Sequence, residues 1–131
     1  MEKPIGVKVA VSFEILILLI YLVSFFISWT VFEEARAISE VRPDISAFGI
    51  GQQDEDFLYF TASVLIYTLL IFGLLHLIPI YLLWQGRKIG KYIATFFAVL
   101  DFFAIMPTIL LSIPVLYFIW FDSKTKDSLS G

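Results

Sequence analysis

A long apolar stretch of the chain, residues 57–84, carries no formal charge and is interrupted only by Gly73, His76 and Pro79. A continuous helix over these residues would be roughly 42 Å long, whereas the hydrocarbon core of a bilayer is about 30 Å thick. The pattern therefore predicts a membrane helix that tilts, bends or protrudes. Because Pro79 has no N–H to donate to the carbonyl of Leu75, we expect a kink directly beside His76.

A second apolar run, residues 9–32, is also long enough to span a bilayer and lacks the small-residue cleavage site of a removable signal peptide. We expect a first transmembrane helix over residues 7–32, in which Glu14 is the one charged residue of the apolar run. Steps of three or four residues from Glu14 place small and polar side chains on one stripe, which we expect to face protein instead of lipid. The stripe comprises Ala10, Glu14, Ile17 or Leu18, Tyr21, Ser24 and Ser28.

Residues 33–56 form a long polar segment with an excess of acidic residues, which we interpret as an acidic outer loop. Its first part, up to Val41, contains good helix formers and either prolongs the first helix or lies along the membrane interface until Pro43 stops it. Gly49 and Gly51 precede no strand and have no further glycine after them, so they do not support nucleotide binding.

A short basic turn follows the second apolar run. It contains the cap glycine Gly86 and the cations Arg87, Lys88 and Lys91. Residues 92–121 are then apolar apart from Asp101. They form either one over-long broken helix or two short helices that turn near residues 106–107, and we favour a hairpin of helices over residues 91–106 and 108–121.

The distribution of positive charge is the reason for favouring the hairpin. With four spans and a cytoplasmic N-terminus, only Arg36 and Arg42 lie outside, which obeys the positive-inside rule. The cations placed inside are Lys3, Lys8, Arg87, Lys88, Lys91, Lys124 and Lys126. The aromatic residues agree with this topology: Trp84, Tyr92, Tyr117 and Trp120 would line the inner interface, and Trp29 and Tyr59 the outer one. Helices of about 15 residues reach only some 22 Å, so the tip of the hairpin should lie below the outer surface.

Composition agrees with this pattern. The chain has 131 residues, of which 60% are hydrophobic and 18% aromatic, and its mean hydropathy of +0.90 is too high for an ordinary soluble domain. We therefore expect an all-α fold in one multi-pass domain of the cell membrane over residues 1–131, a four-transmembrane-helix bundle with both termini cytoplasmic. The chain has no cysteine, which excludes disulfides, thiolate metal sites and cysteine nucleophiles.

Glu14 and His76 are predicted to lie at similar depths, about seven and eight residues from the cytoplasmic ends of neighbouring helices. Two interpretations follow. The pair either shares a proton and titrates near physiological pH, or the two side chains satisfy each other and the Leu75 carbonyl as a structural link between helices.

Asp101 shares one helix face with Ala94 and Ala98, and we expect this face to be a packing seam. A carboxylate at the bilayer centre costs at least about 2.5 kcal/mol, so Asp101 should be neutralised, hydrogen-bonded or exposed to water. It is either a cation or proton site or a structural cap near the hairpin tip. Candidate hydrogen-bond donors are Thr61, Tyr67, Thr68, Thr108 and Ser112.

Enzyme chemistry has little support in this sequence. One histidine and no cysteine cannot make a conventional His-rich metal site, and no nucleophile elbow or phosphate-binding loop is present, so we expect no catalysis, metal or cofactor. The basic cluster Arg87, Lys88 and Lys91 is too short for a nucleic-acid surface, and we interpret it as an anionic-lipid contact.

Three short motifs resemble a broad group of small, uncharacterised four-helix membrane proteins of archaea and bacteria. They are the opening Lys3-Pro-Ile-Gly-Val7, Phe13-Glu-Ile-Leu16 in the first apolar run, and Tyr81-Leu-Leu-Trp-Gln-Gly-Arg-Lys-Ile-Gly-Lys91. That group typically has a basic-Pro-x-Gly-Val opening, a Glu in the first helix and a Trp-x-Gly-Arg-Arg/Lys turn before the third. The resemblance covers both ends of the chain but not the acidic segment, and it implies four spans without implying an activity.

Two functions from different classes follow. The first is a non-catalytic structural or accessory role, in which membrane-embedded faces bind lipids, a membrane-protein partner or a second copy of the chain. The alternative is a small proton-linked transporter or channel that uses Glu14, His76 and Asp101, with Tyr21 and Thr68 in the same polar site. A third possibility is lipid binding in a groove beside the short hairpin.

Overall fold

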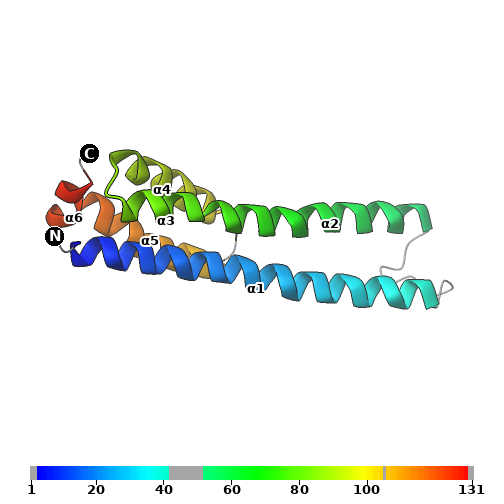
Figure 1. Ribbon diagram of the computed structural model, residues 1–131. Helices are drawn as coiled ribbons and strands as arrows, with labels where there is room; N and C mark the ends of the chain where they lie inside the picture. Colours follow the sequence, from blue (N-terminus) through cyan, green and yellow to red (C-terminus); the bar gives the residue numbers. More distant parts are fainter. Residues whose placement is uncertain (1–2, 42–51, 105, 130–131) are drawn as a thin grey trace. The chain divides into compact units, whose positions relative to one another are not determined.

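The computed structural model describes residues 3–41, 52–104 and 106–129, and all regular secondary structure within them is α-helical (Figure 1). The helices are α1 (Ile5–Val41), α2 (Gln52–Leu75), α3 (Leu77–Trp84), α4 (Lys88–Asp101), α5 (Met106–Trp120) and α6 (Ser123–Ser128). The all-α class predicted from the hydropathy pattern is confirmed.

Among the described residues, two stretches are long and apolar enough to cross a membrane. They are Ile5–Ile38 in α1 and Asp56–Trp84, which comprises most of α2 and all of α3. Only 17% and 22% of their most apolar windows are buried, whereas the core helix of a soluble protein is mostly buried. Pro107–Trp120 is a shorter apolar helix. The four-span bundle stays a prediction.

The first helix is longer than the predicted 7–32, because α1 continues to Val41. Of the two alternatives for this part of the chain, prolongation of the helix is the one observed, as expected from the helix-forming residues after Phe32. The predicted acidic loop over residues 33–56 is therefore wrong in extent, since residues 33–41 and 52–56 are helical. Pro43 and the Gly49 and Gly51 pair lie outside the described residues.

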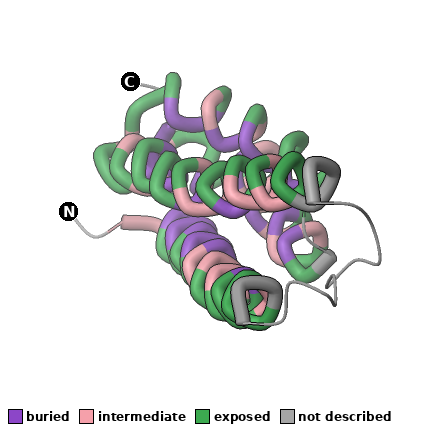
Figure 2. Tube along the Cα trace, turned by 90° about the vertical axis from the view of Figure 1, so that its right-hand side faces the viewer, coloured by how far each residue is buried: buried purple, intermediate pink, exposed green. Residues whose placement is uncertain are grey.

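The chain divides into two compact units, residues 1–20 with 73–131 and residues 21–72. In the first unit, the start of α1 packs with α3, α4, α5 and the end of α6 around one apolar core. Its buried members are Val7, Ala10, Val11, Leu83, Ala94, Val115, Ile119 and Leu129. Figure 2 shows buried positions along one side of α1, with exposed positions around the rest of its surface.

Glycines permit the tight turn between α3 and α4. Gly86 has φ of 72° and its N–H donates to the Leu83 carbonyl, while the Arg87 N–H donates to the Leu82 carbonyl. These are the two hydrogen bonds of a Schellman cap, so Gly86 is the cap glycine that the sequence predicts. At Gly90, an added Cβ would lie 2.8–3.0 Å from Leu82 Cβ and the backbone of residues 82–83, so the absence of a side chain lets α4 pack directly on α3.

Helices α4 and α5 form an antiparallel hairpin. Trp120 Nε1 donates to Thr95 Oγ1 at 2.7 Å at one end, and Thr108 Oγ1 donates to the Asp101 carbonyl at 3.1 Å at the other. The hairpin is therefore the observed alternative, although α4 ends at Asp101 instead of continuing to residue 106. The two helices have 14 and 15 residues, so each is only about 22 Å long.

The C-terminal helix α6 is capped by Asp122, whose Oδ2 accepts from the Thr125 N–H at 3.1 Å and from Thr125 Oγ1 at 2.6 Å. These hydrogen bonds lower the pKa of the Asp122 carboxyl from its usual value of 3.8. Gly6 of α1 lies against this cap, since a Cβ there would collide with the Thr125 hydroxyl.

The second unit is an antiparallel pair formed by the rest of α1 and by α2 up to Phe72. Aromatic rings connect the two helices along their length: Tyr21 contacts Phe72, Phe25 and Trp29 contact Tyr67, and Phe32 contacts Tyr59. Tyr59 also donates from its hydroxyl to the Ala35 carbonyl at 3.1 Å.

Candidate functional site

His76 lies at a break in helical structure between α2 and α3 within the first unit. Its N–H donates to the Gly73 carbonyl, and the break occurs three residues before Pro79, where the sequence predicts a kink. Because proline has no N–H, the carbonyl of Leu75 loses its usual helical partner. The break leaves the His76 side chain fully buried, with its ring 4.9 Å from that of Phe97.

The partner of His76 is Asp101, the last residue of α4. His76 Nε2 lies 3.1 Å from Asp101 Oδ1 and 3.2 Å from Oδ2, and both side chains are fully buried. Two hydroxyls of α5 complete the group. Thr108 donates to the Asp101 carbonyl, and the Ser112 hydroxyl donates to the Thr108 carbonyl at 2.7 Å and lies 3.3 Å from Asp101 Oδ2. The hydrogen bonds thus link the α2–α3 break, α4 and α5.

Glu14 of α1 is the third ionisable residue of this buried polar cluster. It is fully buried, as are Ala10 and Ile17 on the same stripe, and the charges of His76 and Asp101 both act on it. Neither of its carboxylate oxygens has a hydrogen-bond partner among the described residues. A buried carboxyl without partners is costly, so Glu14 differs from Asp101, whose oxygens are paired.

The hydrogen bond between His76 and Asp101 connects two parts of the chain that are 25 residues apart. A carboxylate that accepts from Nε2 fixes the tautomer and orientation of the imidazole. In the part of the chain that the structure describes, no group of three His, Cys, Asp or Glu side chains has the geometry to hold a metal ion. With all three ionisable side chains at 0% exposure, the cluster reaches bulk water only if the helices open.

The structure brings together three of the five residues that the sequence grouped as a polar site. Glu14, His76 and Asp101 are clustered, but His76 is hydrogen-bonded to Asp101 and not to Glu14, the partner suggested by equal depth. Tyr21 is fully buried on the edge of Phe72 in the second unit. Thr68 is exposed in the second unit, and its hydroxyl donates to the Val64 carbonyl of its own helix; its grouping with the cluster stays a prediction.

The predicted lipid contact at the basic turn needs one correction. Arg87 and Lys88 are exposed, as the prediction requires, but Lys91 is 7% exposed and its Nζ lies 4.0 Å from the centre of the Trp120 ring. Lys91 therefore makes a buried cation–π contact between α4 and α5. The burial of Lys91 could have been predicted from helical spacing, because Lys91 shares its face with Ala94, Ala98 and Asp101.

Sequence reasoning gave Thr108 and Ser112 only as two of five candidate donors for Asp101. Both are fully buried against α4. Their spacing of four residues puts them on one face of α5, which becomes informative only once α5 is known to return antiparallel to α4. Sequence reasoning also missed Gly90, where the absence of a side chain lets α4 pack directly on α3.

No protein-family model, curated protein or solved structure matches this chain. The resemblance to small four-helix prokaryotic membrane proteins therefore stays a prediction, and the function has to be inferred from the chain itself.

Proposed function

We propose that the chain is a multi-pass integral protein of the cell membrane with a non-catalytic structural or accessory role. Its exposed surface supports membrane insertion, because large apolar side chains cover the outer faces of the long helices and the hairpin. The most exposed examples are Ile5, Phe26, Phe57, Phe60, Phe103, Leu110 and Phe121. In water these side chains would be an aggregation liability, whereas in a bilayer they are the normal lipid-facing or partner-facing surface.

Four crossings with both termini in the cytoplasm fit the charges and helices best. The candidate spans supply two crossings, and the antiparallel α4–α5 hairpin supplies two shorter ones. Under this topology the exposed cations Arg87, Lys88 and Lys124 lie on the cytoplasmic side. The hairpin helices are shorter than the hydrocarbon core, so their tip at exposed Phe103 would end within the lipid.

The complete burial of Glu14, His76 and Asp101 is the observation that carries the accessory role. Transport requires that an intramembrane site meet water or substrate, whereas these side chains have 0% exposure and His76 is paired with Asp101. We therefore assign the hydrogen-bonded pair of His76 and Asp101 to holding the hairpin against the break between α2 and α3. The exposed apolar faces would then bind lipid, a membrane-protein partner or a second copy of the chain.

Replacement of Glu14 tests this role against transport. Glu14→Gln keeps the size and removes the charge, so an accessory protein should change only in stability. The experiment compares the wild type and Glu14→Gln in liposomes with a pH-sensitive dye, under an imposed proton gradient, with Ser12→Ala at an exposed position of α1 as the control variant. We expect the same dye response as in protein-free vesicles for all three. Wild-type flux that Glu14→Gln abolishes while the helix content is retained would overturn the accessory role.

A proton-linked transporter is the second candidate, and one observation favours it. Both carboxylate oxygens of Glu14 lack a hydrogen-bond partner among the described residues, although they are buried beside the His76 and Asp101 pair. Unpaired buried polar groups are retained at functional sites more often than elsewhere. In this role Glu14 would bind and release the proton, and the liposome experiment above gives the opposite result.

A further inference from the structure

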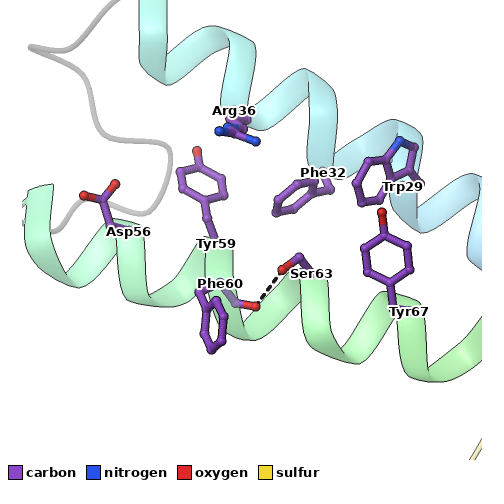
Figure 3. A pocket seen from close by; sticks show the side chains of 8 residues that line it. All are labelled: Trp29, Phe32, Arg36, Asp56, Tyr59, Phe60, Ser63 and Tyr67. Atoms are coloured by element: carbon purple, nitrogen blue, oxygen red, sulfur yellow. Dashed lines mark hydrogen bonds between the residues drawn. The ribbon is translucent and has the colours of Figure 1, made fainter.

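A second site lies in the second unit, where the end of α1 and the start of α2 enclose a groove of about 400 Å³. This volume is within the range of small-molecule sites. Figure 3 shows the residues around it. The lining residues are Trp29, Phe32, Arg36, Asp56, Tyr59, Phe60, Ser63 and Tyr67.

The groove is amphipathic along its length. Trp29, Phe32 and Tyr67 form its apolar end, with ring centroids of Trp29 5.4 Å from those of both Phe32 and Tyr67. Arg36 and Asp56 form its polar end, and Figure 3 places them on opposite helices with the Tyr59 ring between them. The apolar end suits an acyl chain, and the cation and anion at the polar end suit a headgroup that carries one negative and one positive charge.

Contacts between α1 and α2 hold the two walls of the groove in place. The Tyr59 hydroxyl of α2 donates to the Ala35 carbonyl of α1, and the Tyr59 ring packs edge-on against Phe32. A ligand that enters therefore finds a preformed site and does not have to order it, which favours binding.

The groove lies at the depth of lipid headgroups under the proposed topology. Trp29 is about twenty residues beyond Val9, where the first apolar run begins, and about twenty helical residues cross the hydrocarbon core. Arg36 lies a further two turns out, or roughly 10 Å, which is the region of phosphates and headgroup amines. Tryptophan and tyrosine are enriched at this boundary, as at the apolar end of the groove.

We infer that this groove binds one outer-leaflet phospholipid with a zwitterionic phosphate–ammonium headgroup. Arg36 binds the phosphate, for which the planar guanidinium fork is well shaped. Asp56 and the face of the Tyr59 ring bind the ammonium group. The first part of one acyl chain lies against Trp29, Phe32 and Tyr67. The inference rests on the proposed membrane insertion and names one lipid ligand of that role.

The test is native mass spectrometry of the full chain, purified in detergent and titrated with three lipids of identical acyl chains. The probes are phosphatidylethanolamine, phosphatidylglycerol and diacylglycerol. We expect one retained lipid, in the order of affinity phosphatidylethanolamine, phosphatidylglycerol, diacylglycerol. Arg36→Gln should weaken binding of both phospholipids about tenfold, because a charge-assisted phosphate contact is lost. Asp56→Asn should weaken binding of phosphatidylethanolamine and leave binding of the other two lipids unchanged.

Lys124→Gln is the matched control, because it removes an exposed cation in the first unit that has no assigned lipid contact. It should leave binding of all three lipids unchanged. Equal binding of diacylglycerol and phosphatidylethanolamine, or equal effects of Arg36→Gln and Lys124→Gln, would overturn the inference. Water-soluble glycerophosphoethanolamine should not compete at equal concentration, and competition would show that the site takes the free headgroup instead of a lipid.

Alkaline carbonate extraction separates failure of this inference from failure of the proposed function. A chain that stays in the membrane pellet but binds the three lipids equally leaves the membrane role intact and removes only the lipid site. Release of the chain into the supernatant by carbonate would rule out the membrane role and, with it, the lipid site.

Discussion

Replacing Glu14 by methionine should stabilise the protein. Both Glu14 oxygens are buried without a hydrogen-bond partner among the described residues, and such a group destabilises the folded state by about 1–3 kcal/mol. Methionine has a similar length and equally good helix propensity, and it has no polar group to bury. We expect a gain of about 1 kcal/mol or more in the free energy of unfolding.

The contrast variant is Asp101→Ala, which removes a carboxylate that has partners. It leaves His76 buried without the acceptor 3.1 Å away, and we expect a loss of about 1–3 kcal/mol. Glu14→Gln retains an unpaired polar group, so its free energy of unfolding should increase less than that of Glu14→Met.

The assay is reversible unfolding of the full chain in mixed micelles with increasing dodecyl sulfate, followed by circular dichroism. A stabilised Glu14→Met beside a destabilised Asp101→Ala would support the different roles that the structure gives these two carboxylates. Destabilisation of Glu14→Met by as much as Asp101→Ala would refute the reasoning, because it would mean that Glu14 is paired in the folded protein.

Three further predictions concern the packing of the first unit. Gly90→Ala should lower stability by about 1–3 kcal/mol in the same assay, because its Cβ would lie 2.8–3.0 Å from α3, whereas Ile89→Ala at an exposed position should change it by about 0.5 kcal/mol or less. Lys91→Met should lower the unfolding midpoint through loss of the cation–π contact with Trp120, and an unchanged midpoint would show that the contact is weak. Asp122 has a lowered pKa in the folded chain, so its capping contribution is present above the usual value of 3.8 and is lost as the pH falls through the lower folded value. Amide exchange corrected for its intrinsic pH dependence should therefore show less protection of residues 123–128 at pH 2 than at pH 5, and equal protection would contradict the capping role.

The local features of the fold were predictable because they depend on residues close in sequence. The stripe through Ala10, Glu14, Ile17 and Tyr21 is fully buried, as helical periodicity predicts. The break before Pro79 and the cap at Gly86 follow from backbone chemistry that is specific to proline and glycine. The continuation of α1 to Val41 was left open, since helix propensity is a weak guide to where an amphipathic end stops.

The partner of His76 was not predictable in the same way. Counting residues along the first two apolar runs places Glu14 and His76 at the same depth. This count contains no information on where α4 ends or on how α5 packs against it. Asp101 contacts His76 from the last position of α4, which ends five residues earlier than predicted. Lys91 was misassigned for a related reason: its neighbours in sequence are exposed cations, whereas its neighbours in space are α4 and α5.

The most direct test of the four-span topology is labelling of single cysteines in intact cells. The chain contains no cysteine, so a single introduced thiol is labelled without background from the protein itself. Glu34→Cys and Lys124→Cys replace exposed residues on opposite sides of the proposed membrane. With a membrane-impermeant maleimide, we expect Glu34→Cys to react in intact cells and Lys124→Cys to react only after permeabilisation. Reaction of Lys124→Cys in intact cells would contradict the topology on which the account depends.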